Sequence, residues 1–484
     1  MTIKAGLYID GAWASSQSSA TFTAFNPSTE QPIARYAIAS AADVDRAVAA
    51  AASAFPDWST TEAAERGRCL ESLLEAYERR ADDLAVALSE EMGAPIDFSR
   101  ASQVRSGANH LRAFIAALKE FPFVESVGPH APDQAVRHEA VGVAALITPW
   151  NWPLNQIALK VGAALAAGCP MVLKPSEISP NSATIFAEIV DAAGMPKGVF
   201  NLVQGDGATT GATLAAHDKV DVISFTGSTR AGSAISRSAA GSIKRVSLEL
   251  GGKSPSVVFA DSDVAKAVRW TANFCFNNAG QSCNAATRLL VARSVYDEAV
   301  AIAAETARAT QVAPAGDPGA HIGPLSSKQQ FDKVQGHIEQ AVGEGARLVA
   351  GGPGRPDALP TGWFARPTVF ADVGPEHTLF REEVFGPVLA ITPFDDEADA
   401  VALANDTEYG LSAYIHTADE ERMRRVSRQV RAGMVQFNGQ GRAPGTPFGG
   451  YKRSGNGREG GRWGIEEFLE VKLVTGVPAG GKTA

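Results

Sequence analysis

The sequence predicts an α/β protein in which two largely parallel sheets are covered by helices. From Glu139 onwards, short apolar runs end in Gly or Pro turns and are followed by helical stretches, which is the pattern of repeated strand–helix units. A second alternating series starts at residues 256–259 and continues to about Phe437. The length of 484 residues corresponds to about three structural units at ~150 residues each.

Before the first series, the chain is expected to be helical between residues 40 and 120. Helix-forming residues recur at helical spacing in residues 42–55 and 62–91, with an N-cap expected at residues 60–62. The expected strands of the first series are 141–147, 170–174, 198–203, 220–226 and 244–250. The expected helices between them are 154–167, 182–193, 211–216 and 231–239. Residues 351–360 and 439–461 are rich in Gly and Pro and are expected to be loops.

Composition and charge exclude several classes of protein. Lys and Arg number 44 against 53 Asp and Glu, so the net charge of −9 gives no indication of nucleic-acid binding. An apolar share of 45% argues against disorder. The longest apolar stretches, residues 140–147 and 158–167, are shorter than the ~18 residues of a membrane span. The start of the sequence resembles neither a signal peptide nor a presequence, and the four cysteines are sparse, so we expect a cytoplasmic protein with reduced thiols.

Two glycine patterns match phosphate-binding motifs without the context that such motifs need. Residues 476–483 fit the phosphate-loop pattern, but no helix can follow them to hold a phosphate. Residues 455–460 fit the dinucleotide fingerprint, but they follow no strand and open no βαβ unit. Neither segment is interpreted as a nucleotide site. Because the sequence has no Cys-x-x-Cys pair, we also expect no metal site.

Three segments carry residues suited to acyl chemistry. Cys283 lies among small and amide residues that leave room for a substrate, although a lone cysteine is more often a small buried apolar group. Glu249 ends an apolar strand, where burial would raise its pKa toward that of a general base; the alternative is a solvated acid. Asn151 is framed by Trp150, Trp152 and two prolines, so its amide could donate to an oxyanion or serve only in a turn.

Two strand ends suit a nucleotide. Lys174 and Glu177 follow the second expected strand and could hold ribose hydroxyls, or they could form a surface ion pair of little energetic value. Gly227 and Ser228 follow a later strand and open a helix. A helix N-terminus with a glycine that permits close approach suits a diphosphate, but ordinary strand–helix turns look the same.

Taken together, these segments identify the chain as similar to the aldehyde dehydrogenase superfamily of NAD(P)-dependent oxidoreductases. The resemblance runs from about Ile9 to Lys472. Seven motifs stand in the family's order: the Trp-Asn turn, Lys-Pro-Ser-Glu, Phe-Thr-Gly-Ser, Glu-Leu-Gly-Gly-Lys, Gly-Gln-Ser-Cys, Glu-Glu-Val-Phe-Gly-Pro-Val and the segment from Pro447 to Glu459. Any one of them is weak evidence, whereas seven in order make coincidence implausible.

The resemblance implies a role for each matching residue. Cys283 resembles the nucleophile that forms a thiohemiacetal and, after hydride transfer to nicotinamide, a thioester. Asn151 and the backbone amide of Cys283 would hold the oxyanion, and Glu249 would activate the hydrolytic water. Lys160 and Glu459 match positions of a proton relay. The residues implied for the cofactor are Ile147, Trp150, Lys174, Glu177, Gly227, Ser228, Gly232, Leu250, Glu383 and Phe385. Since Glu177 would repel a 2′-phosphate, the expected cofactor is NAD, with NADP possible.

The family resemblance also implies an aldehyde dehydrogenase-like fold with a division into domains. We expect a cofactor domain in residues 1–122 and 142–251, a catalytic domain in 252–452, and a segment 453–468 that returns to the cofactor domain. Residues 123–141 and 469–484 would form a small β oligomerisation flap, where residues 134–138 alternate polar and apolar side chains. Its exposed strand edges favour a homodimer or homotetramer.

By the same resemblance, Trp152, Asn155 and Leu159 line the substrate tunnel, with the helix around residues 103–114 as its opposite wall. This mixture favours an aromatic or medium-chain aldehyde. Arg442 could instead hold the carboxylate of a semialdehyde, although a solvated loop arginine is the more ordinary interpretation. Two other functions stay open: a CoA-acylating dehydrogenase, against which Glu249 argues, and a binding protein that keeps the fold without turnover.

Overall fold

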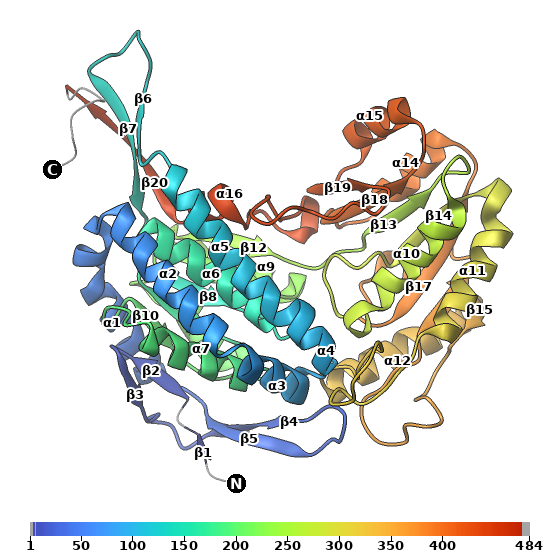
Figure 1. Cartoon of the computed structure of the whole chain (residues 1–484), viewed down its shortest axis with the longest axis horizontal. Coiled ribbons are helices and arrows are strands. Elements are labelled where there is room, and N and C mark those ends of the chain that lie inside the picture. Colours follow the sequence, from blue (N-terminus) through green and yellow to red (C-terminus); the bar gives the residue numbers. More distant parts are fainter. Residues whose placement is uncertain (1–2, 5, 477–484) are drawn as a thin grey trace.

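The protein is described by a computed structural model that covers residues 3–4 and 6–476 (Figure 1). Its described strands form two seven-stranded sheets and two three-stranded sheets. The first large sheet has the order β12-β11-β8-β9-β10-β2-β3. Its strands are β2 (Leu7–Ile9), β3 (Ala12–Ala14), β8 (Ala144–Ile147), β9 (Met171–Lys174), β10 (Phe200–Leu202), β11 (Val222–Thr226) and β12 (Arg245–Glu249). All neighbours are parallel except where β2 joins β10 and β3.

Both faces of this sheet are buried, which explains why its strands read as continuous apolar runs. Leu146 and Leu173 face one apolar core, and Ile147 and Val172 face the other. The helices of the first core are α2 (Ala63–Arg79), α3 (Ala81–Met92), α5 (Arg105–Glu120), α6 (Pro153–Ala167) and α7 (Pro180–Ala192). The helices of the second core are α1 (Ala41–Thr60), α8 (Ala212–Ala216) and α9 (Thr229–Ala239).

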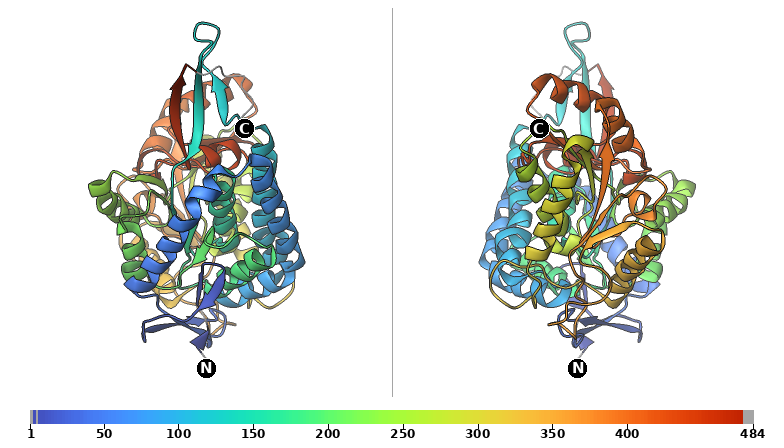
Figure 2. Two further views of the ribbon diagram at one scale, coloured as in Figure 1. Left: turned by 90° about the vertical axis from the view of Figure 1, so that its left-hand side faces the viewer. Right: turned by 90° about the vertical axis from the view of Figure 1, so that its right-hand side faces the viewer.

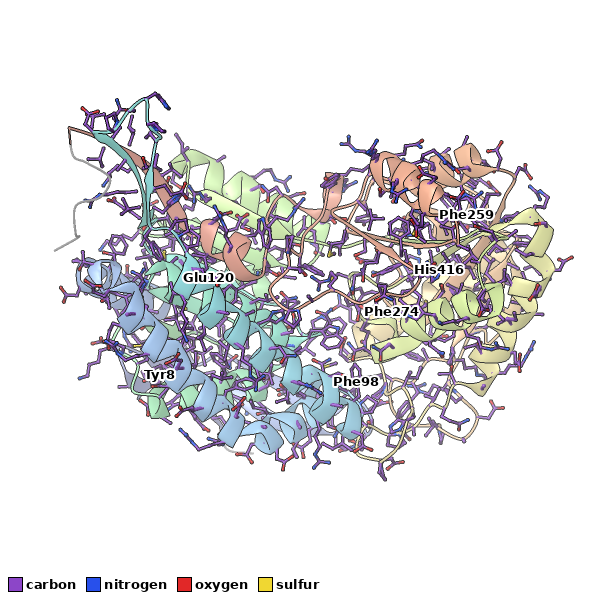
Figure 3. All side chains as sticks on the ribbon, turned by 45° about the horizontal axis from the view of Figure 1, so that its top comes forward. Tyr8, Phe98, Glu120, Phe259, Phe274 and His416 are labelled. Atoms are coloured by element: carbon purple, nitrogen blue, oxygen red, sulfur yellow. The ribbon has the colours of Figure 1, made fainter. Side chains whose placement is uncertain are left out.

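The second large sheet has the order β15-β16-β17-β14-β13-β18-β19 and is parallel apart from β15. Its strands are β13 (Pro255–Val258), β14 (Arg288–Ala292), β15 (Arg347–Ala350), β16 (Thr368–Ala371), β17 (Val388–Phe394), β18 (Ser412–His416) and β19 (Met434–Phe437). The helices around it are α10 (Val264–Phe276), α11 (Tyr296–Ala309), α12 (Lys328–Gly343), α13 (Thr378–Arg381), α14 (Glu397–Asn405) and α15 (Glu420–Gln429). Side chains fill the layers of both halves, with Phe98 of α4 (Ile96–Phe98) and Phe274 of α10 near their junction (Figure 3).

A three-stranded antiparallel ribbon extends away from both large sheets (Figures 1 and 2). It consists of β6 (Val124–Ser126), β7 (Gln134–Ala140) and β20 (Leu469–Thr475), in the order β20-β7-β6. The pairing of β20 with β7 runs without a break from Leu469 opposite Ala140 to Thr475 opposite Gln134. The other small sheet contains β1 (Ile3–Lys4), β5 (Pro32–Ala37) and β4 (Thr21–Phe25), and α16 (Gly461–Glu466) precedes β20.

The predicted fold class is confirmed, and two local predictions are wrong. The expected helical segment 62–91 is two helices, because the chain turns at Arg80 between α2 and α3. Of the N-cap expected at residues 60–62, only Glu62 is the N-cap residue of α2 and its side chain makes no capping bond, while Thr60 and Thr61 end α1, where the Thr61 hydroxyl donates to the Asp57 carbonyl. Most of the phosphate-loop pattern at residues 476–483 lies outside the described residues. None of the helices in the described part of the chain has the length and apolar character to cross a membrane.

Candidate active site

A cavity of about 520 Å³ lies between the two large sheets. It is bounded by α5, by the turn between β8 and α6, by the turn between β11 and α9, and by the loops around Cys283 and Phe448. The sequence-predicted residues that line it are Trp150, Asn151, Trp152, Asn155, Leu159, Gly227, Ser228, Leu250, Cys283, Glu383, Phe385 and Arg442. Residues from both halves of the chain therefore meet at one site.

A strained turn fixes the loop that carries Cys283. Asn278, Ala279 and Gly280 follow one another in the left-handed region, with φ values of 53°, 54° and 74°. Asparagine tolerates this conformation better than alanine, and glycine adopts it without steric cost. A Cβ at position 280 would also collide with the backbone of Gly386. The Asn-Ala-Gly sequence thus delivers a half-buried Cys283 to the cavity.

The Asn151 side chain is held in place beside this loop. Its Nδ2 donates to the backbone carbonyl of Gln281 at 3.1 Å, and the backbone carbonyl of Asn151 accepts from Asn278 Nδ2 at 3.0 Å and Gln103 Nε2 at 3.2 Å. A primary amide has two N–H groups, and only one of them takes part in this bond. The second N–H is available to a ligand atom in the cavity that Asn151 and Cys283 share.

The surroundings of Cys283 favour the protonated form of its thiol. Burial raises the pKa of the Cys283 thiol well above its usual range, and the carboxylates of Glu383 and Glu249 raise the pKa further. A cation brought close to the sulfur would act in the opposite direction. A thiol in such surroundings would need a positively charged ligand or a base close by to react as a thiolate.

Glu249 ends β12 behind the cavity lining, where it is 2% exposed. Within the described chain, neither of its carboxylate oxygens has a hydrogen-bond partner. Burial raises the pKa of Glu249 well above the usual carboxyl value, and the nearby charge of Glu459 raises it further, while Lys160 opposes the shift. A buried carboxylate with a raised pKa and free lone pairs is suited to take a proton from water.

Lys160 and Glu459 form a buried ion pair next to Glu249. The Nζ of Lys160 lies 2.6 Å from Glu459 Oε1 and donates to Ser224 Oγ at 2.9 Å. The two side chains are 1% and 7% exposed. Glu459 is fixed through its backbone, which pairs with Phe448 of the cavity lining. The charges of Lys160 and Glu459 both act on the pKa of the Glu249 carboxyl.

One end of the cavity has the features of a dinucleotide site. Ser228 caps α9 by accepting the N–H of Ala231 at 3.2 Å, so the free amides of this helix face the turn at Gly227. A Cβ at Gly232 would lie 2.7 Å from Leu250 Cδ2, which shows how closely α9 approaches β12. The Oγ1 of Thr226 is buried without a partner in the described chain.

Glu383 and Phe385 extend this end of the cavity toward Cys283. Glu383 Oε1 accepts the backbone N–H of Gly252 at 2.8 Å. Phe385 has a left-handed backbone with φ of 60°, and its ring meets Trp150 edge-on at 5.5 Å. Lys174 Nζ lies 3.7 Å from Glu177 Oε2 and donates to the Gly205 carbonyl. Of the predicted residues, those outside the cavity lining are Ile147, Lys160, Lys174, Glu177, Gly232, Glu249 and Glu459.

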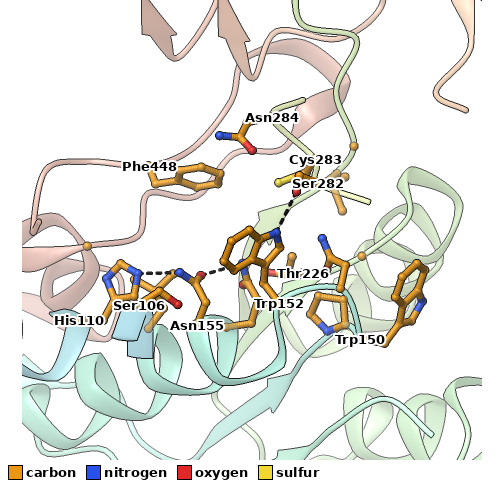
Figure 4. A pocket seen from close by; sticks show the side chains of 18 of the residues that line it. Ser106, His110, Trp150, Trp152, Asn155, Thr226, Ser282, Cys283, Asn284 and Phe448 are labelled. Atoms are coloured by element: carbon orange, nitrogen blue, oxygen red, sulfur yellow. Dashed lines mark hydrogen bonds between the residues drawn. The ribbon is translucent and has the colours of Figure 1, made fainter. Parts of the chain in front are cut away.

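The other end of the cavity contains both aromatic and polar side chains. Trp152 donates its indole N–H to Ser282 Oγ at 2.8 Å and meets Phe98 edge-on at 5.5 Å (Figure 4). Asn155 Nδ2 lies 2.9 Å from His110 Nε2. The guanidinium of Arg442 stacks on the Phe448 ring, 4.8 Å from its centroid.

The residues of this end that sequence reasoning missed include Ser106, His110, Phe274, Ser282 and Phe448. Ser106 and His110 are four residues apart on α5, so a helical projection of the expected tunnel wall would have placed them on one face. The sequence offers no comparable signal for Phe274. No group of three or more His, Cys, Asp or Glu that could hold a metal occurs within the described residues.

A cysteine on a strained turn, a fixed amide and a buried carboxylate thus stand near a helix terminus suited to a nucleotide, and these are groups that a nucleotide-dependent oxidoreductase could use. The sequence model of the aldehyde dehydrogenase family matches residues 13–474. The chain belongs to the aldehyde dehydrogenase family, and the predicted enzyme class is confirmed.

Similar proteins cover the chain almost end to end. A Pseudomonas 3-succinoylsemialdehyde-pyridine dehydrogenase is 48% identical over 473 residues, which span 97% of this chain and 98% of the relative. The crystal structure of an aldehyde dehydrogenase from Bartonella henselae is 50% identical, with a TM-score of 0.97 over 98% of this chain and 100% of that chain. A Pseudomonas syringae aldehyde dehydrogenase C variant, solved with NAD⁺ and octanal, is 47% identical, with a TM-score of 0.95 and coverages of 97% and 96%.

Proposed function

We propose that this protein oxidises a medium-chain aliphatic or aromatic aldehyde to the carboxylic acid with NAD as the hydride acceptor. The observation that carries the proposal is that Cys283 and Asn151 line one cavity, while the buried Glu249, outside the lining, has no hydrogen-bond partner within the described chain. One end of this cavity suits a nucleotide, and the other end, lined by aromatic and polar side chains, suits an organic aldehyde.

In the first half-reaction, the Cys283 thiolate adds to the aldehyde carbon. The carbonyl oxygen becomes an oxyanion that the free N–H of Asn151 and the backbone N–H of Cys283 stabilise. Bound NAD supplies the acceptor for the hydride that leaves the former aldehyde carbon. Loss of that hydride leaves an acyl thioester on Cys283.

In the second half-reaction, Glu249 removes a proton from the attacking water. The water oxygen bonds to the acyl carbon, the carbon–sulfur bond breaks, and the acid leaves with Cys283 restored. The proton on Glu249 passes to the neighbouring Lys160–Glu459 pair, whose buried charges are close enough to influence the Glu249 carboxyl. The base activates water, so hydrolysis is favoured over transfer to CoA.

The residues at the nucleotide end fit NAD. The N-terminus of α9 and the turn at Gly227 suit the diphosphate, and the unpartnered Thr226 hydroxyl is available as a further hydrogen-bonding group. Glu383 and Phe385 would take the nicotinamide riboside, next to the thiol. Glu177, held near Lys174, would accept from the adenosine ribose hydroxyls and repel a 2′-phosphate. NAD⁺ complexes of relatives support this assignment.

The substrate end favours aromatic or medium-chain aldehydes, in agreement with a relative solved with octanal. A semialdehyde is the second candidate, because Arg442 lines the cavity and has no carboxylate within ion-pair distance among the described residues. One relative is also named a semialdehyde dehydrogenase. Arg442 would then bind the substrate carboxylate.

The assembly is proposed to be a homodimer or homotetramer in the cytoplasm, with residues 123–141 and the C-terminal strand as the oligomerisation flap. The edge strand β20 leaves Val471 and Leu473 exposed to 68% and 59%. A partner subunit would cover these side chains and pair with the strand edge. The large sheets would serve as cofactor and catalytic domains, divided near Gly251.

An aldehyde panel with NAD, followed by NADH absorbance, tests the function. Octanal and 3-phenylpropanal should be turned over, and Cys283→Ala should abolish NADH formation while the protein stays folded. The product should be the free acid with or without CoA. An acyl-CoA product would contradict the hydrolytic mechanism, and undiminished turnover by the variant would contradict the role of Cys283.

A further inference from the structure

The wall of the substrate end formed by α5 and α6 is polar and uncharged. Its side chains are those of Ser106, Asn109, His110, Asn155 and Gln156. Leu159 is the apolar member of this wall. The aromatic side chains Trp152, Phe274 and Phe448 line other parts of the same end. An alkyl chain packed against the polar wall would remove these groups from water without replacing their hydrogen bonds, which is unfavourable.

The hydrogen-bonding capacity of this wall is not used up within the described chain. His110 and Asn155 bond to each other at 2.9 Å, and Gln156 Nε2 donates to Asn155 Oδ1 at only 3.4 Å. His110 Nδ1 and Gln156 Oε1 are buried without partners. Buried polar atoms are nearly always paired in folded proteins, so unpaired ones beside a binding cavity point to a ligand or water partner.

The wall is suited to a neutral rather than an ionic group. Burial and the nearby charge of Arg442 lower the pKa of His110 to about 4, so the imidazole is uncharged at neutral pH. The other wall side chains are amides and a hydroxyl. Arg442, whose charge acts on His110, has its guanidinium against the Phe448 ring. Figure 4 shows the His110–Asn155 pair on one side of Trp152 and Trp150 on the other side.

We infer that the His110–Asn155 pair is a specificity site that binds an uncharged hydrogen-bonding group of the substrate, such as a keto oxygen or a ring nitrogen, several atoms away from the aldehyde carbon. This inference rests on the proposed aldehyde oxidation and narrows its substrate class. The ring or chain of the substrate would contact Trp152 and Phe448. Its polar group would form hydrogen bonds with the wall of α5 and α6. The aldehyde would then lie at Cys283.

Shape-matched substrates test the inference. 3-Phenylpropanal and the three isomers of 3-pyridylpropanal differ by one ring C–H replaced with nitrogen, and octanal can be compared with its 4-, 5- and 6-oxo derivatives. In the wild type, at least one polar member of each series should exceed its apolar parent in kcat/KM by about tenfold, the effect of one or two hydrogen bonds. The aldehyde acid 8-oxooctanoate is a separate test, which shows whether a carboxylate on the substrate raises kcat/KM by binding to Arg442.

Variants locate the effect. Asn155→Leu and His110→Met should each reduce the ratio of kcat/KM for the polar substrate to that for its apolar parent toward one, because the polar substrate loses more. Leu159→Ala, on the same wall, should change kcat/KM for the polar substrate and for its apolar parent by the same factor. The ratio of the two values should therefore stay as in the wild type. If the His110–Asn155 pair had only a structural role, the variants would lower kcat/KM for both substrates by the same factor. Melting temperatures reveal any variant that does not fold.

The possible failures are distinguishable. If neither member of a pair is oxidised with NAD, the proposed function itself is wrong. If both are oxidised with equal kcat/KM by the wild type, or if the two variants leave the ratio unchanged, the aldehyde oxidation stands and the specificity site is refuted. A preference for 8-oxooctanoate over every neutral analogue would also overturn the inference.

Discussion

The indole N–H of Trp152 donates to Ser282 Oγ at 2.8 Å, and this bond joins the substrate wall to the residue that precedes the nucleophile. Trp152 is further braced by Phe98 on α4. We therefore predict that substrate fit and the position of the proposed nucleophile Cys283 are coupled through this contact.

Replacing Trp152 with Phe keeps an aromatic wall but removes this hydrogen bond. A neutral hydrogen bond contributes about 1 kcal/mol, so we expect kcat/KM to fall about fivefold for octanal. Ser282→Ala should cause a similar loss. The double variant should lose little more than either single variant, and steady-state kinetics of the three enzymes measure this coupling. Fully additive losses would show that the two residues act independently.

The sequence indicated the residues that carry local motifs and missed those that depend on distant contacts. Cys283, Glu249 and Asn151 stand in recognisable segments. The Lys160–Glu459 pair is separated by 299 positions and was reached only through family resemblance. The break at Arg80 escaped prediction because neither Gly nor Pro marks it. The left-handed Ala279 is set by tertiary packing of the Cys283 loop rather than by local propensity.

Replacing Glu249 with Gln should lower kcat about 10²–10⁴-fold, because a general base contributes that much. In the wild type, burial raises the pKa of Glu249, so kcat should fall as the pH drops through this raised value. The variant should lack that limb of the profile. A pH–rate series at saturating octanal measures both effects, and a retained limb would assign the titration to another group.

The same substitution should stabilise the protein at alkaline pH. A carboxyl with a raised pKa binds its proton more tightly in the folded than in the unfolded state, so the free energy of unfolding falls as the pH rises between the two pKa values. Glu249→Gln removes this loss. Thermal melts at pH 5 and pH 8 should therefore show the variant gaining in Tm relative to the wild type as pH increases. If the variant instead lost Tm relative to the wild type as the pH increased, the result would contradict a Glu249 carboxyl whose pKa is raised by burial.

Gly280→Ala should disrupt the Cys283 loop. The added Cβ would meet the backbone of Gly386, and the residue would still need a φ of 74°. Overpacking of this kind costs about 1–3 kcal/mol, which urea unfolding can measure. Gly316→Ala is the matched control, since a Cβ there has no atom within 4 Å. Equal stability of the two variants would show that the turn can relax.

Glu383→Gln should make the Cys283 thiol more reactive. After burial, the Glu383 charge is the first cause that raises the pKa of this thiol, so its removal increases the thiolate fraction at a given pH. The rate of iodoacetamide labelling, followed on the Cys283 peptide by mass spectrometry, should rise severalfold at pH 8. Glu382→Gln, one residue away and exposed, is the control. Equal labelling rates in the two variants would show that the Glu383 charge does not determine the reactivity of the Cys283 thiol.

Glu177→Ser should increase the use of NADP relative to NAD. The Glu177 carboxylate lies 3.7 Å from Lys174 Nζ, so its removal leaves a cation without its acidic neighbour at the proposed ribose site. A 2′-phosphate would then meet attraction instead of repulsion, and we expect the ratio of kcat/KM for NADP to that for NAD to rise about tenfold or more. Glu120→Ser, an exposed acid at the end of α5, should leave the ratio unchanged. The assignment of Glu177 to cofactor selection fails if the two variants show the same ratio as the wild type.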